Sequence, residues 1–305
     1  MRVFVTGASG WIGSAVVPEL ISHDHQVTAL ARSDAAARVL REAGAEVVRG
    51  SLDDLDTLHN AAAGSEGVIH LAFKHDAAFS GDFKSAIAAD RDAVTAIGSA
   101  LAGTHRPFIA TGGTPAVPDR TATEHDGRPT TTNPIDDNSP AARAKTDEMV
   151  LALSTRAIRS AVLRLPRAVY GENDPGFTTS LIATARNKGV SGYIGDGSQR
   201  WPVTHRLDTA RAYRLALEKA PAGSLLNIVG QEGVTIRSIA ETIARHLGVP
   251  LSSVAAENAL EHFGWLGALV SLDQPASSAI TRDLLGWRPM HPTLLEDLDR
   301  GHYFR

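Results

Sequence analysis

The sequence predicts an α/β fold, in which a doubly wound parallel sheet with helices on both faces is joined to a smaller C-terminal lobe. Short apolar runs alternate with helical patterns through the first 170 residues, and this alternation is typical of βαβ units. The first apolar run leads directly into a glycine-rich turn and a helix. From about Gly171 the segments become shorter and are interrupted by glycine and proline, which indicates a second structural unit.

The first strand is expected at residues 2–5, and a helix is expected at residues 14–21. Between them the chain reads Thr6-Gly7-Ala8-Ser9-Gly10-Trp11-Ile12-Gly13. Gly7 permits a tight turn, Gly10 lets a pyrophosphate approach the backbone, and Gly13 lets the helix lie against the strand. The N–H groups at the start of the helix then face the phosphate charge. An ordinary glycine-rich turn is the alternative, but the strand–turn–helix context favours a dinucleotide site.

The second strand, residues 26–31, ends at Arg32 and Ser33. An acidic side chain at this point usually accepts hydrogen bonds from the ribose hydroxyls of NAD, whereas an arginine suits a 2′-phosphate. Because no carboxylate precedes Arg32, we expect NADP(H) as the cofactor. A solvated arginine at the start of the next helix is the alternative.

The remaining elements of the first 170 residues follow in order. His70 lies alone inside an apolar strand, so we expect it to be a hydrogen-bonded core histidine. Residues 123–140 are rich in Thr, Asp, Pro and Asn and are expected to form a loop. The expected helices cover residues 35–43, 54–62 (with Asp53 as N-cap), 79–101 and 141–153, and the expected strands cover residues 46–48, 68–72, 107–111 and 160–165.

The later elements suggest how the chain is divided. We assign residues 1–170, with parts of 200–230 returning to the sheet, to an NADP(H)-binding domain, and residues 171–305 mainly to a substrate-binding lobe. Thr235 and Gly248 have the character of an N-cap and a C-cap around one helix. The expected helices cover residues 177–187, 207–219, 235–247, 277–285 and 294–298, and the expected extended segments cover residues 193–194 and 224–229.

Composition excludes several classes of function. The net charge of the 305 residues is −4 and no basic run stands out, so nucleic-acid binding is not expected. The absence of cysteine excludes disulfides, thiolate catalysis and cysteine-ligated metal, and no metal site is predicted. The longest apolar stretch, residues 265–272, is too short to span a bilayer, and no secretory signal precedes the first strand. We expect a cytoplasmic protein that does not bind membranes.

Five motifs together resemble the extended short-chain dehydrogenase/reductases, a group that includes nucleotide-sugar epimerases, dehydratases and 3β-hydroxysteroid dehydrogenase-like proteins. The resemblance spans nearly the whole chain and implies a Rossmann domain with a smaller lobe that closes over the substrate. The motifs are the glycine turn from Thr6 to Gly13, His70-Leu71-Ala72, Arg164-Leu165-Pro166 with Val169-Tyr170-Gly171, Gly195-Asp196-Gly197 leading to His205-Arg206-Leu207-Asp208, and Leu285-Gly286-Trp287-Arg288-Pro289.

The resemblance also implies which positions contact the cofactor. The glycine turn holds the pyrophosphate, Arg32 reads the 2′-phosphate, and the segments after later strands line the adenine and the nicotinamide. The implied cofactor-binding residues are Gly7, Ser9, Gly10, Trp11, Ile12, Gly13, Arg32, Ser51, Leu52, Leu71, Ala72, Thr111, Lys145 and Pro166.

The chain departs from the family at its catalytic positions. The family usually employs a Tyr-x-x-x-Lys pair, in which the phenol gives a proton to the carbonyl oxygen while hydride arrives from the nicotinamide. If Lys145 is the lysine, Ala141 stands at the tyrosine position; if Glu148 marks the register, the two positions become Pro140 and Ala144. The usual serine after the fifth strand falls on Gly113, with Thr111 and Thr114 nearby. The normal proton donor is absent.

Other residues could replace the missing phenol. The candidate catalytic residues are Lys145, Tyr170, Tyr193, His205 and Thr111, with His125 as a weaker one. Pocket lining is the alternative role for Tyr170 and Tyr193, and packing is expected for Tyr213 and Tyr303. Lys145 could hold the cofactor ribose or be a solvated helix lysine.

Three functions remain open. The first is NADPH-dependent reduction of a small carbonyl, imine or activated C=C compound, because an iminium already carries the charge that a carbonyl must be given. The second is a non-catalytic NADP(H)-binding sensor or scaffold. The third, a nucleotide-sugar epimerase or dehydratase, depends on the missing phenolate.

Aromatic residues of the C-terminal lobe (Phe177, Trp201, Phe263 and Trp265) could form an apolar pocket or simply pack its core. The expected partner is a small-molecule substrate, and a homodimer is possible.

Overall fold

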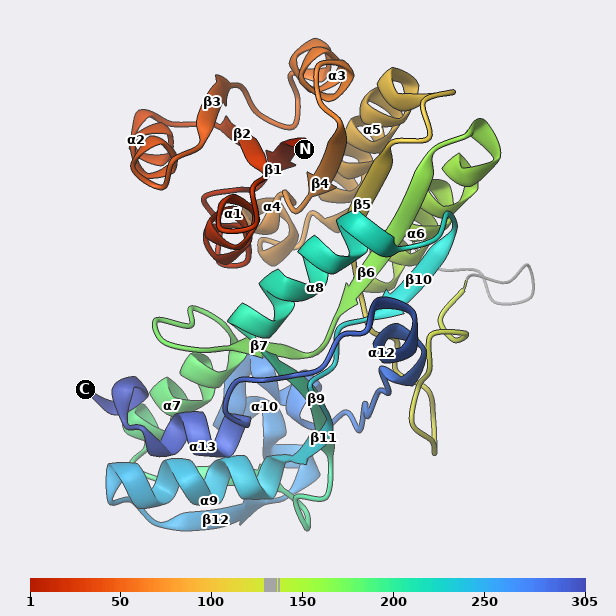
Figure 1. Cartoon of the computed structure of the whole chain (residues 1–305). Helices are drawn as coiled ribbons and strands as arrows, with labels where there is room; N and C mark the ends of the chain where they lie inside the picture. Colours follow the sequence, from red (N-terminus) through yellow and green to blue (C-terminus); the bar gives the residue numbers. More distant parts are fainter. Residues whose placement is uncertain (129–135, 137) are drawn as a thin grey trace.

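The computed structural model describes residues 1–128, 136 and 138–305. Seven parallel strands form a central sheet in the order β10-β6-β5-β4-β1-β2-β3, which confirms the predicted doubly wound α/β fold (Figure 1). The residues that were expected to form a loop at 129–135 and 137 lie outside the described part of the chain. The strands of this sheet are β1 Arg2–Thr6, β2 Gln26–Ala31, β3 Glu46–Arg49, β4 Gly67–His70, β5 Pro107–Gly113, β6 Arg159–Leu165 and β10 Ser224–Asn227.

The strand order reverses beside β1, which pairs with β2 on one side and with β4 on the other. In open α/β sheets a ligand binds outside the carboxyl ends of the strands at such a reversal. The central strands β1 and β4 are buried along nearly their whole length because both of their faces are covered, as expected of a parallel sheet. The fold therefore directs the search for a site to the carboxyl ends of β1, β4, β5 and β6.

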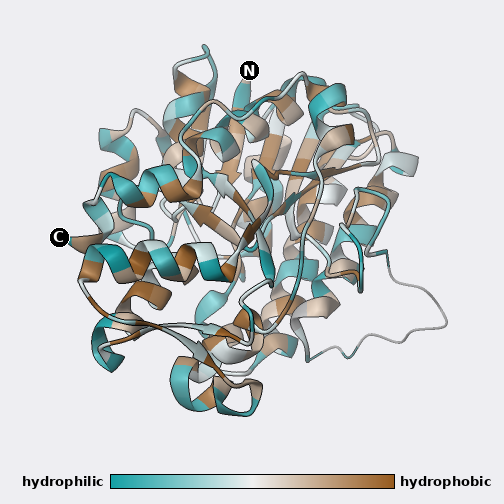
Figure 2. Cartoon of the chain, turned by 90° about the horizontal axis from the view of Figure 1, so that it is seen from below, coloured by the Kyte–Doolittle hydropathy of each residue, from teal (hydrophilic) through white to brown (hydrophobic). Residues whose placement is uncertain are grey.

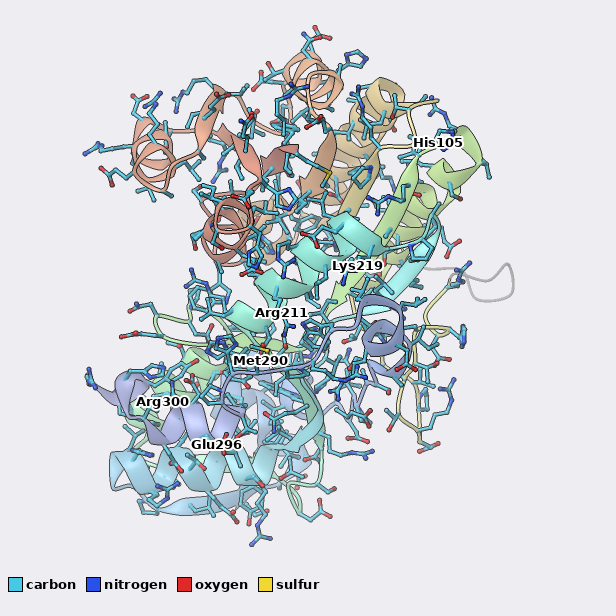
Figure 3. The ribbon with its side chains drawn as sticks, viewed as in Figure 1. His105, Arg211, Lys219, Met290, Glu296 and Arg300 are labelled. Carbon is cyan, nitrogen blue, oxygen red and sulfur yellow. The ribbon has the colours of Figure 1, made fainter. Side chains whose placement is uncertain are left out.

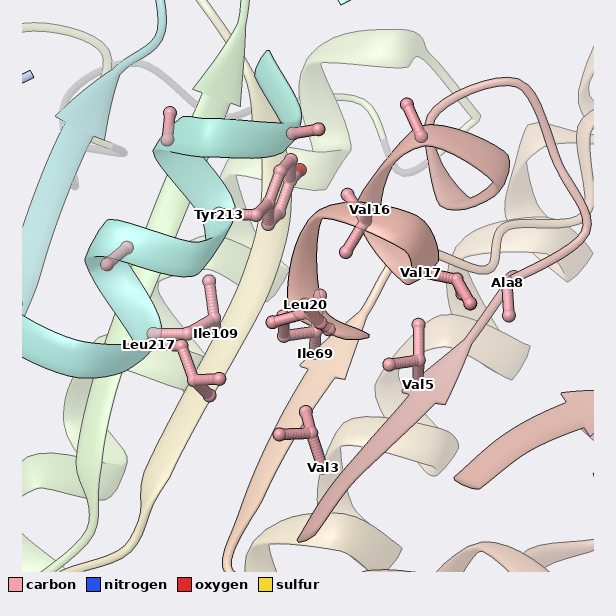
Figure 4. Packing of buried hydrophobic residues seen from close by; sticks show 14 of the residues in the cluster. Val3, Val5, Ala8, Val16, Val17, Leu20, Ile69, Ile109, Tyr213 and Leu217 are labelled. Atoms are coloured by element: carbon pink, nitrogen blue, oxygen red, sulfur yellow. The ribbon is translucent and has the colours of Figure 1, made fainter. Parts of the chain in front are cut away.

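Helices bury apolar stripes against both faces of the sheet. On one face α1 (Gly13–Ile21), α2 (Asp34–Glu42) and α8 (Arg206–Lys219) share a core with the strands. Figure 4 shows Val16, Val17 and Leu20 of α1 near Tyr213 and Leu217 of α8, above apolar residues of the strands. The other face is covered by α3 (Leu55–Ala63), α5 (Phe83–Leu101) and α6 (Arg143–Ala152).

Three helix starts differ from the prediction. The helix expected at residues 79–101 begins only at Phe83, as α5, because Gly81 has a φ of +94° and Asp82 caps α5 by accepting a hydrogen bond from the Ser85 N–H. Phe79 is instead the last residue of a separate short helix, α4 (His75–Phe79). The N-cap of α3 is Asp54, not Asp53, and its carboxylate accepts from the Ser51 N–H. The helix expected from residue 141 begins with a 3₁₀ turn, Pro140–Ala142, before α6.

The C-terminal part has its own apolar core and two small sheets. One sheet contains β7 (Ala168–Tyr170), β9 (Arg200–His205) and β11 (Gln231–Thr235), and the other pairs β8 (Ser191–Ile194) with β12 (Leu251–Val254). The sequence did not reveal β9, β11 or β12. The helices of this part are α7 Phe177–Lys188, α9 Ile236–Leu247, α10 Ala259–Phe263, α11 Gly267–Val270, α12 Ala279–Leu285 and α13 Leu294–Asp299. The division of the chain at residue 170 stays a prediction.

The predicted caps of α9 are confirmed. The Thr235 side chain accepts a hydrogen bond from the Ser238 N–H, and Gly248 ends the helix with a φ of +66°. Arginine and histidine in the last turn of this helix also face the negative end of its dipole.

The segment after α12 crosses back over α8. Trp287 is fully buried and donates a hydrogen bond from its indole to the Asp208 carbonyl, while Arg211 donates to the Arg288 carbonyl. Figure 3 labels Arg211 and Met290 at this crossing, between the central sheet and the C-terminal core. Figure 2 shows that many helices are brown on one side and teal on the other, as expected of helices that cover a core. No helix of the described residues is long and apolar enough to cross a membrane.

Candidate cofactor and substrate site

The turn after β1 needs glycine at two positions. Gly7 has a φ of +66°, and a Cβ atom there would lie 2.6 Å from the Ala72 nitrogen. A Cβ atom on Gly13 would lie 2.2 Å from the Gly7 carbonyl oxygen. Both distances are too short for any side chain, so the tight turn and the close packing predicted for these two glycines are present.

Gly10 serves a different purpose. A Cβ atom there would meet only the Gly7 carbonyl oxygen, at 3.2 Å, so the space beside Gly10 is open. The backbone N–H groups of Trp11 and Ile12 have no acceptor among the described residues, and they stand at the N-terminal end of α1. An open backbone with free donors at the positive end of a helix is what a pyrophosphate requires. The residues present therefore fit a dinucleotide.

The indole of Trp11 connects the turn to the rest of the molecule. It donates a hydrogen bond to the Val169 carbonyl at 3.0 Å, and the guanidinium of Arg206 lies 4.2 Å from its ring centroid. Arg206 also donates to the Ser14 hydroxyl at 2.9 Å. Ser9, on the same turn, is exposed. These contacts hold the turn against β7 and the start of α8.

Arg32 is exposed directly after β2, beside the start of α2. Ser33 caps this helix by accepting a hydrogen bond from the Ala36 N–H. The nearest acidic residue along the chain, Asp34, pairs with Arg49 at 3.2 Å, and Arg49 also donates to the Arg32 carbonyl. The end of β2 thus carries two arginines and one carboxylate that is already paired.

The two residues expected at the adenine follow β3. Ser51 is half-buried and is held by Asp54, whose carboxylate accepts from its N–H and its hydroxyl. Leu52 is buried in the core under α3. Both follow the carboxyl end of β3, on the same side of the β1 reversal as Arg32.

A buried polar chain lies beneath the glycine turn. The Thr6 hydroxyl is 2.7 Å from His70 Nδ1, and His70 Nε2 is 3.1 Å from Asp90 Oδ1. Thr6 Oγ1 also accepts a hydrogen bond from the Ala72 N–H at 3.2 Å. His70 is therefore the hydrogen-bonded core histidine that was predicted. This network of hydrogen bonds holds Leu71 and Ala72, which are both half-buried, next to the turn.

The residues expected to meet the cofactor come together at one edge of the sheet. The glycine turn follows β1, Leu71 and Ala72 follow β4, Thr111 lies near the end of β5, and Pro166 follows β6. These four strands are neighbours and parallel, so their carboxyl ends share that edge. The assignment of each residue to a part of the cofactor stays a proposal.

The N-terminal end of α6 presents an arginine that sequence reasoning missed. Arg143 donates from Nη2 to the Thr111 carbonyl at 2.8 Å, and its guanidinium carbon lies 4.3 Å from the ring centroid of Phe73. Lys145 is two residues farther along, about 200° around the helix, so it faces a different direction. Lys145 is half-buried and has partners of its own. The only sequence signal for Arg143 was its place in the first turn of α6.

Asp147 is the second residue that sequence reasoning missed. Its carboxylate oxygens lie 2.6 and 2.8 Å from the place where a Cβ atom on Gly112 would stand, so this glycine makes room for the acid beside β5. Burial raises the pKa of Asp147 to about 7, against the opposing charges of Arg143 and Arg164. The signal in the sequence was the Thr111-Gly112-Gly113 run, which leaves space where side chains normally stand.

The hydroxyl of Thr111 is held within the protein. It donates to the His70 carbonyl at 2.9 Å and lies 2.7 Å from the Tyr213 hydroxyl. Tyr213 is fully buried, and burial raises the pKa of its phenol. Because the Thr111 hydroxyl already donates its proton to a hydrogen bond with the His70 carbonyl, we propose that Thr111 is a positioning residue and not a proton donor.

The other substitutes have structural roles. Tyr170 is 2% exposed, its hydroxyl donates to the Pro292 carbonyl at 2.7 Å, and burial raises its pKa. His205 caps α8 by accepting a hydrogen bond from the Leu207 N–H, and its ring stacks on His291 with 4.6 Å between the ring centroids. Burial lowers the pKa of His205 to about 4, so this side chain is neutral near pH 7. Tyr193, which lies on β8, packs against Arg237 of α9. His125 lies in the loop after β5. No hydrogen bond, ion pair or ring contact of the described residues joins these side chains to Arg143, and a role as proton donor stays a prediction for each of them.

His205 also belongs to a cluster of possible metal ligands with Asp208 and His291, whose ligand atoms lie within 4.8 Å of one another. The Asp208 carboxylate already accepts hydrogen bonds from the Met290 N–H, the His291 N–H and His291 Nδ1. These bonds hold the C-terminal segment to α8, which explains the cluster without a metal.

Aromatic rings run from Arg143 into the C-terminal part. Phe73 lies 5.2 Å from His75 and Phe79 lies 5.8 Å from His75, measured between ring centroids. Trp265 follows at 6.3 Å from Phe79 and 5.8 Å from Phe177. Phe79 is 68% exposed and Trp265 is 59% exposed, which is unusual for side chains of this size. Phe263 and Trp201, by contrast, are buried in the C-terminal core.

Comparison with known proteins adds to this geometry. The model of the NAD dependent epimerase/dehydratase family matches residues 3–229. An uncharacterized protein of Schizosaccharomyces pombe is 42% identical over 304 residues, which is 100% of each chain. The 4-hydroxy-2-methyl-3-oxo-4-farnesyl-3,4-dihydroquinoline-1-oxide ketoreductase of Stigmatella aurantiaca is 26% identical over 263 residues, covering 82% of this chain and 74% of that relative.

A solved structure shows the same fold. The UDP-glucuronic acid 4-epimerase of Bacillus cereus, in complex with UDP-glucuronic acid and NAD, superposes with a TM-score of 0.72 at 18% identity and covers 99% of this chain and 98% of its own. The seven-stranded parallel sheet, the glycine turn and the family match agree. The chain belongs to the NAD-dependent epimerase/dehydratase family, among the NAD(P)-dependent enzymes of the short-chain dehydrogenase/reductase type.

Proposed function

We propose that the protein is an NADPH-dependent reductase that transfers hydride to a small carbonyl, imine or activated C=C compound. One observation carries the proposal: the dinucleotide turn is complete, while the start of α6 lacks the family's tyrosine in both registers and instead directs Arg143 to the end of β5. Ala141, one of the two positions considered for the tyrosine, is an exposed alanine. NADPH supplies the hydride when it is bound, and the protein supplies the binding and the orientation.

The same observation argues against epimerisation and dehydration of sugars. Those reactions begin with removal of a proton from a sugar hydroxyl, which requires a base such as a phenolate. An arginine keeps its proton at every physiological pH and cannot serve as that base. Reduction places a weaker demand on the protein, since the acceptor must gain a proton only after or as hydride arrives.

The end of β2 supports NADPH over NADH. Arg32 is exposed beside the start of α2, and the carboxylate of Asp34 is paired with Arg49. A 2′-phosphate is attracted by an arginine near a helix start, whereas ribose hydroxyls need a free carboxylate acceptor. The preference for NADP(H) therefore depends on Arg32.

A non-catalytic NADP(H)-binding sensor or scaffold is the second candidate. It is favoured by the sequence at the start of α6, where neither Pro140 nor Ala141 provides the phenol that donates the proton in the family. A sensor binds NADPH as a reductase does, but it has no turnover.

Turnover separates these functions. Purified protein is mixed with NADPH or NADH and a panel of ketones, aldehydes, enones and cyclic imines, and the absorbance of the reduced nicotinamide is followed. A reductase consumes NADPH faster than NADH with at least one substrate class. A sensor binds NADPH and consumes none, and an epimerase converts a nucleotide sugar while the cofactor remains unconsumed.

A further inference from the structure

We propose that Arg143 binds the oxygen of the group that is reduced, and that the substrate is a neutral carbonyl compound (a ketone, an aldehyde or an enone), not an iminium ion. This inference rests on the proposed reductase function and selects among its three substrate classes. It assigns a catalytic contact to a residue that the family's usual Tyr-x-x-x-Lys pattern does not contain.

Arg143 stands where the reaction must take place. It lies in the first turn of α6 and bonds to the backbone of Thr111, near the carboxyl end of β5. Its guanidinium faces Phe73, which follows Leu71 and Ala72 after β4. The glycine turn after β1 packs against Ala72, so the arginine and the dinucleotide turn contact neighbouring residues of the same short segment.

Its hydrogen-bonding capacity is only partly used. A guanidinium has five N–H donors, and among the described residues Arg143 donates a hydrogen bond only to the Thr111 carbonyl. Its Nε atom is buried and has no hydrogen-bond partner. A buried donor without an acceptor is costly, and a bound ligand oxygen removes that cost.

Its charge is also only partly compensated. The described residues form no ion pair with Arg143 within 4.0 Å. The closest acid along the helix, Asp147, has a pKa raised to about 7 by burial and is partly protonated at neutral pH. Asp147 therefore offsets only part of the positive charge at the start of α6.

The position of the guanidinium is well fixed. Phe73 covers one face of its plane, and the Thr111 carbonyl holds one end. Thr111 is itself held by the bond from its hydroxyl to the His70 carbonyl, and His70 is held by Asp90 and Thr6. A preorganised donor costs little reorganisation when charge develops on a substrate oxygen.

The chemistry follows from this charge. NADPH, when bound, would supply the hydride that forms the C–H bond at the carbonyl carbon, the π pair of the C=O bond would move to the oxygen, and the cofactor would leave as NADP⁺. Arg143 donates hydrogen bonds to the resulting alkoxide but keeps its own protons, so the proton of the alcohol comes from water. An iminium ion carries a positive charge to the same place and is repelled by Arg143.

The experiment compares Arg143→Ala and Arg143→Lys with the wild-type protein. Arg237→Ala is the matched control, because Arg237 is also a helix arginine above an aromatic ring, 5.4 Å from the centroid of Tyr193, but lies in the C-terminal part. The neutral probes are α-tetralone and 2-cyclohexenone, and the cationic probe of similar shape is the N-methyl-3,4-dihydroisoquinolinium ion. Circular dichroism and the NADPH dissociation constant report whether each variant is folded.

We expect Arg143→Ala to lose about 10²- to 10³-fold in kcat for the carbonyl probes, with an NADPH dissociation constant within about threefold of wild type. Guanidinium at low millimolar concentration should restore part of the activity of Arg143→Ala, and Arg143→Lys should retain more than the alanine variant. Arg237→Ala should behave as wild type. A merely structural role predicts no rescue by guanidinium.

Two results overturn the inference and leave the reductase function standing. One is carbonyl reduction by Arg143→Ala at the wild-type rate, and the other is reduction of the iminium probe in preference to the neutral probes. Absence of turnover with every probe counts against the reductase function instead. In that case binding of benzoate to the NADP⁺-loaded protein, measured by calorimetry, decides on Arg143: loss in Arg143→Ala supports an oxygen-binding site, and equal or absent binding refutes it.

Discussion

Substitution of Gly10 by valine should abolish dinucleotide binding and leave the fold intact. A Cβ atom at this position meets only the Gly7 carbonyl oxygen, at 3.2 Å, so the chain has to yield by a few tenths of an ångström. We expect the free energy of unfolding to fall by less than about 1 kcal/mol, as for most substitutions outside a core. The valine side chain, however, fills the open space beside the N–H groups of Trp11 and Ile12. The NADPH dissociation constant should rise at least 100-fold, which is about 2.8 kcal/mol of binding free energy.

Gly13→Ala is the informative comparison. Its Cβ atom would lie 2.2 Å from the Gly7 carbonyl oxygen and 2.6 Å from the Cα atom of Ala8, so the backbone itself has to move. Overpacking of this kind typically costs about 1–3 kcal/mol of stability. Gly10→Val should therefore separate binding from stability, whereas Gly13→Ala should reduce both.

The assay combines fluorescence titration with NADPH and urea unfolding for the wild-type protein and the two variants. An NADPH dissociation constant of Gly10→Val within threefold of wild type refutes the assignment of this turn to the pyrophosphate. Unfolding of Gly10→Val as severe as that of Gly13→Ala refutes the geometric argument.

Three further predictions concern single side chains. Arg32→Ala should weaken NADPH binding about tenfold and leave NADH binding nearly unchanged, because only the 2′-phosphate loses a charged partner; equal loss for both cofactors in parallel titrations contradicts the 2′-phosphate role. Asp147→Asn should flatten the pH dependence of the free energy of unfolding between about pH 4 and pH 7. Burial raises the pKa of the wild-type carboxyl from 3.8 to about 7, so the group stays protonated in the folded protein over this range but ionises in the unfolded chain. The free energy of unfolding of the wild-type protein therefore falls as pH rises, by at most about 4 kcal/mol. Equal changes in the free energy of unfolding of the wild-type protein and Asp147→Asn between pH 4.5 and pH 7.5 contradict this. Ala141→Ser should keep kcat within about threefold of wild type, because Ala141 is exposed and has no assigned role; a collapse of kcat shows that this position takes part in the reaction.

The architecture of the central sheet could be predicted from the sequence. Its strands are apolar runs separated by helices of clear period, and burial on both faces leaves few other ways to arrange them. The glycine turn could also be predicted from the sequence, because Gly7 and Gly13 are positions where the surrounding backbone excludes any side chain. Two strands of the C-terminal part were missed for different reasons. β12 is short and mostly exposed, so it lacks an apolar pattern, whereas β9 contains Pro202, which is unusual inside a strand.

The start of α6 could not be read from the sequence. The sequence is compatible with two registers there, one ending at Lys145 and one at Ala144, and the contact to Thr111 is made by Arg143 instead. A shift of one or two residues rotates a helix by about 100° to 200°, and tertiary packing decides which side chain faces the sheet. Asp147 was missed for a related reason: the glycine that makes room for its carboxylate, Gly112, lies on β5, and only the packing of α6 against β5 brings the two residues together.

The most direct test of the account follows the hydride itself. Wild-type protein is incubated with NADPH deuterated at nicotinamide C4, in each of its two stereoisomers, and with α-tetralone or 2-cyclohexenone; the product is then examined by mass spectrometry. The account predicts NADP⁺ formation and a product that is one mass unit heavier with one stereoisomer only. A product without deuterium, or a substrate that is converted while the cofactor stays reduced, contradicts the proposal that this protein is a reductase.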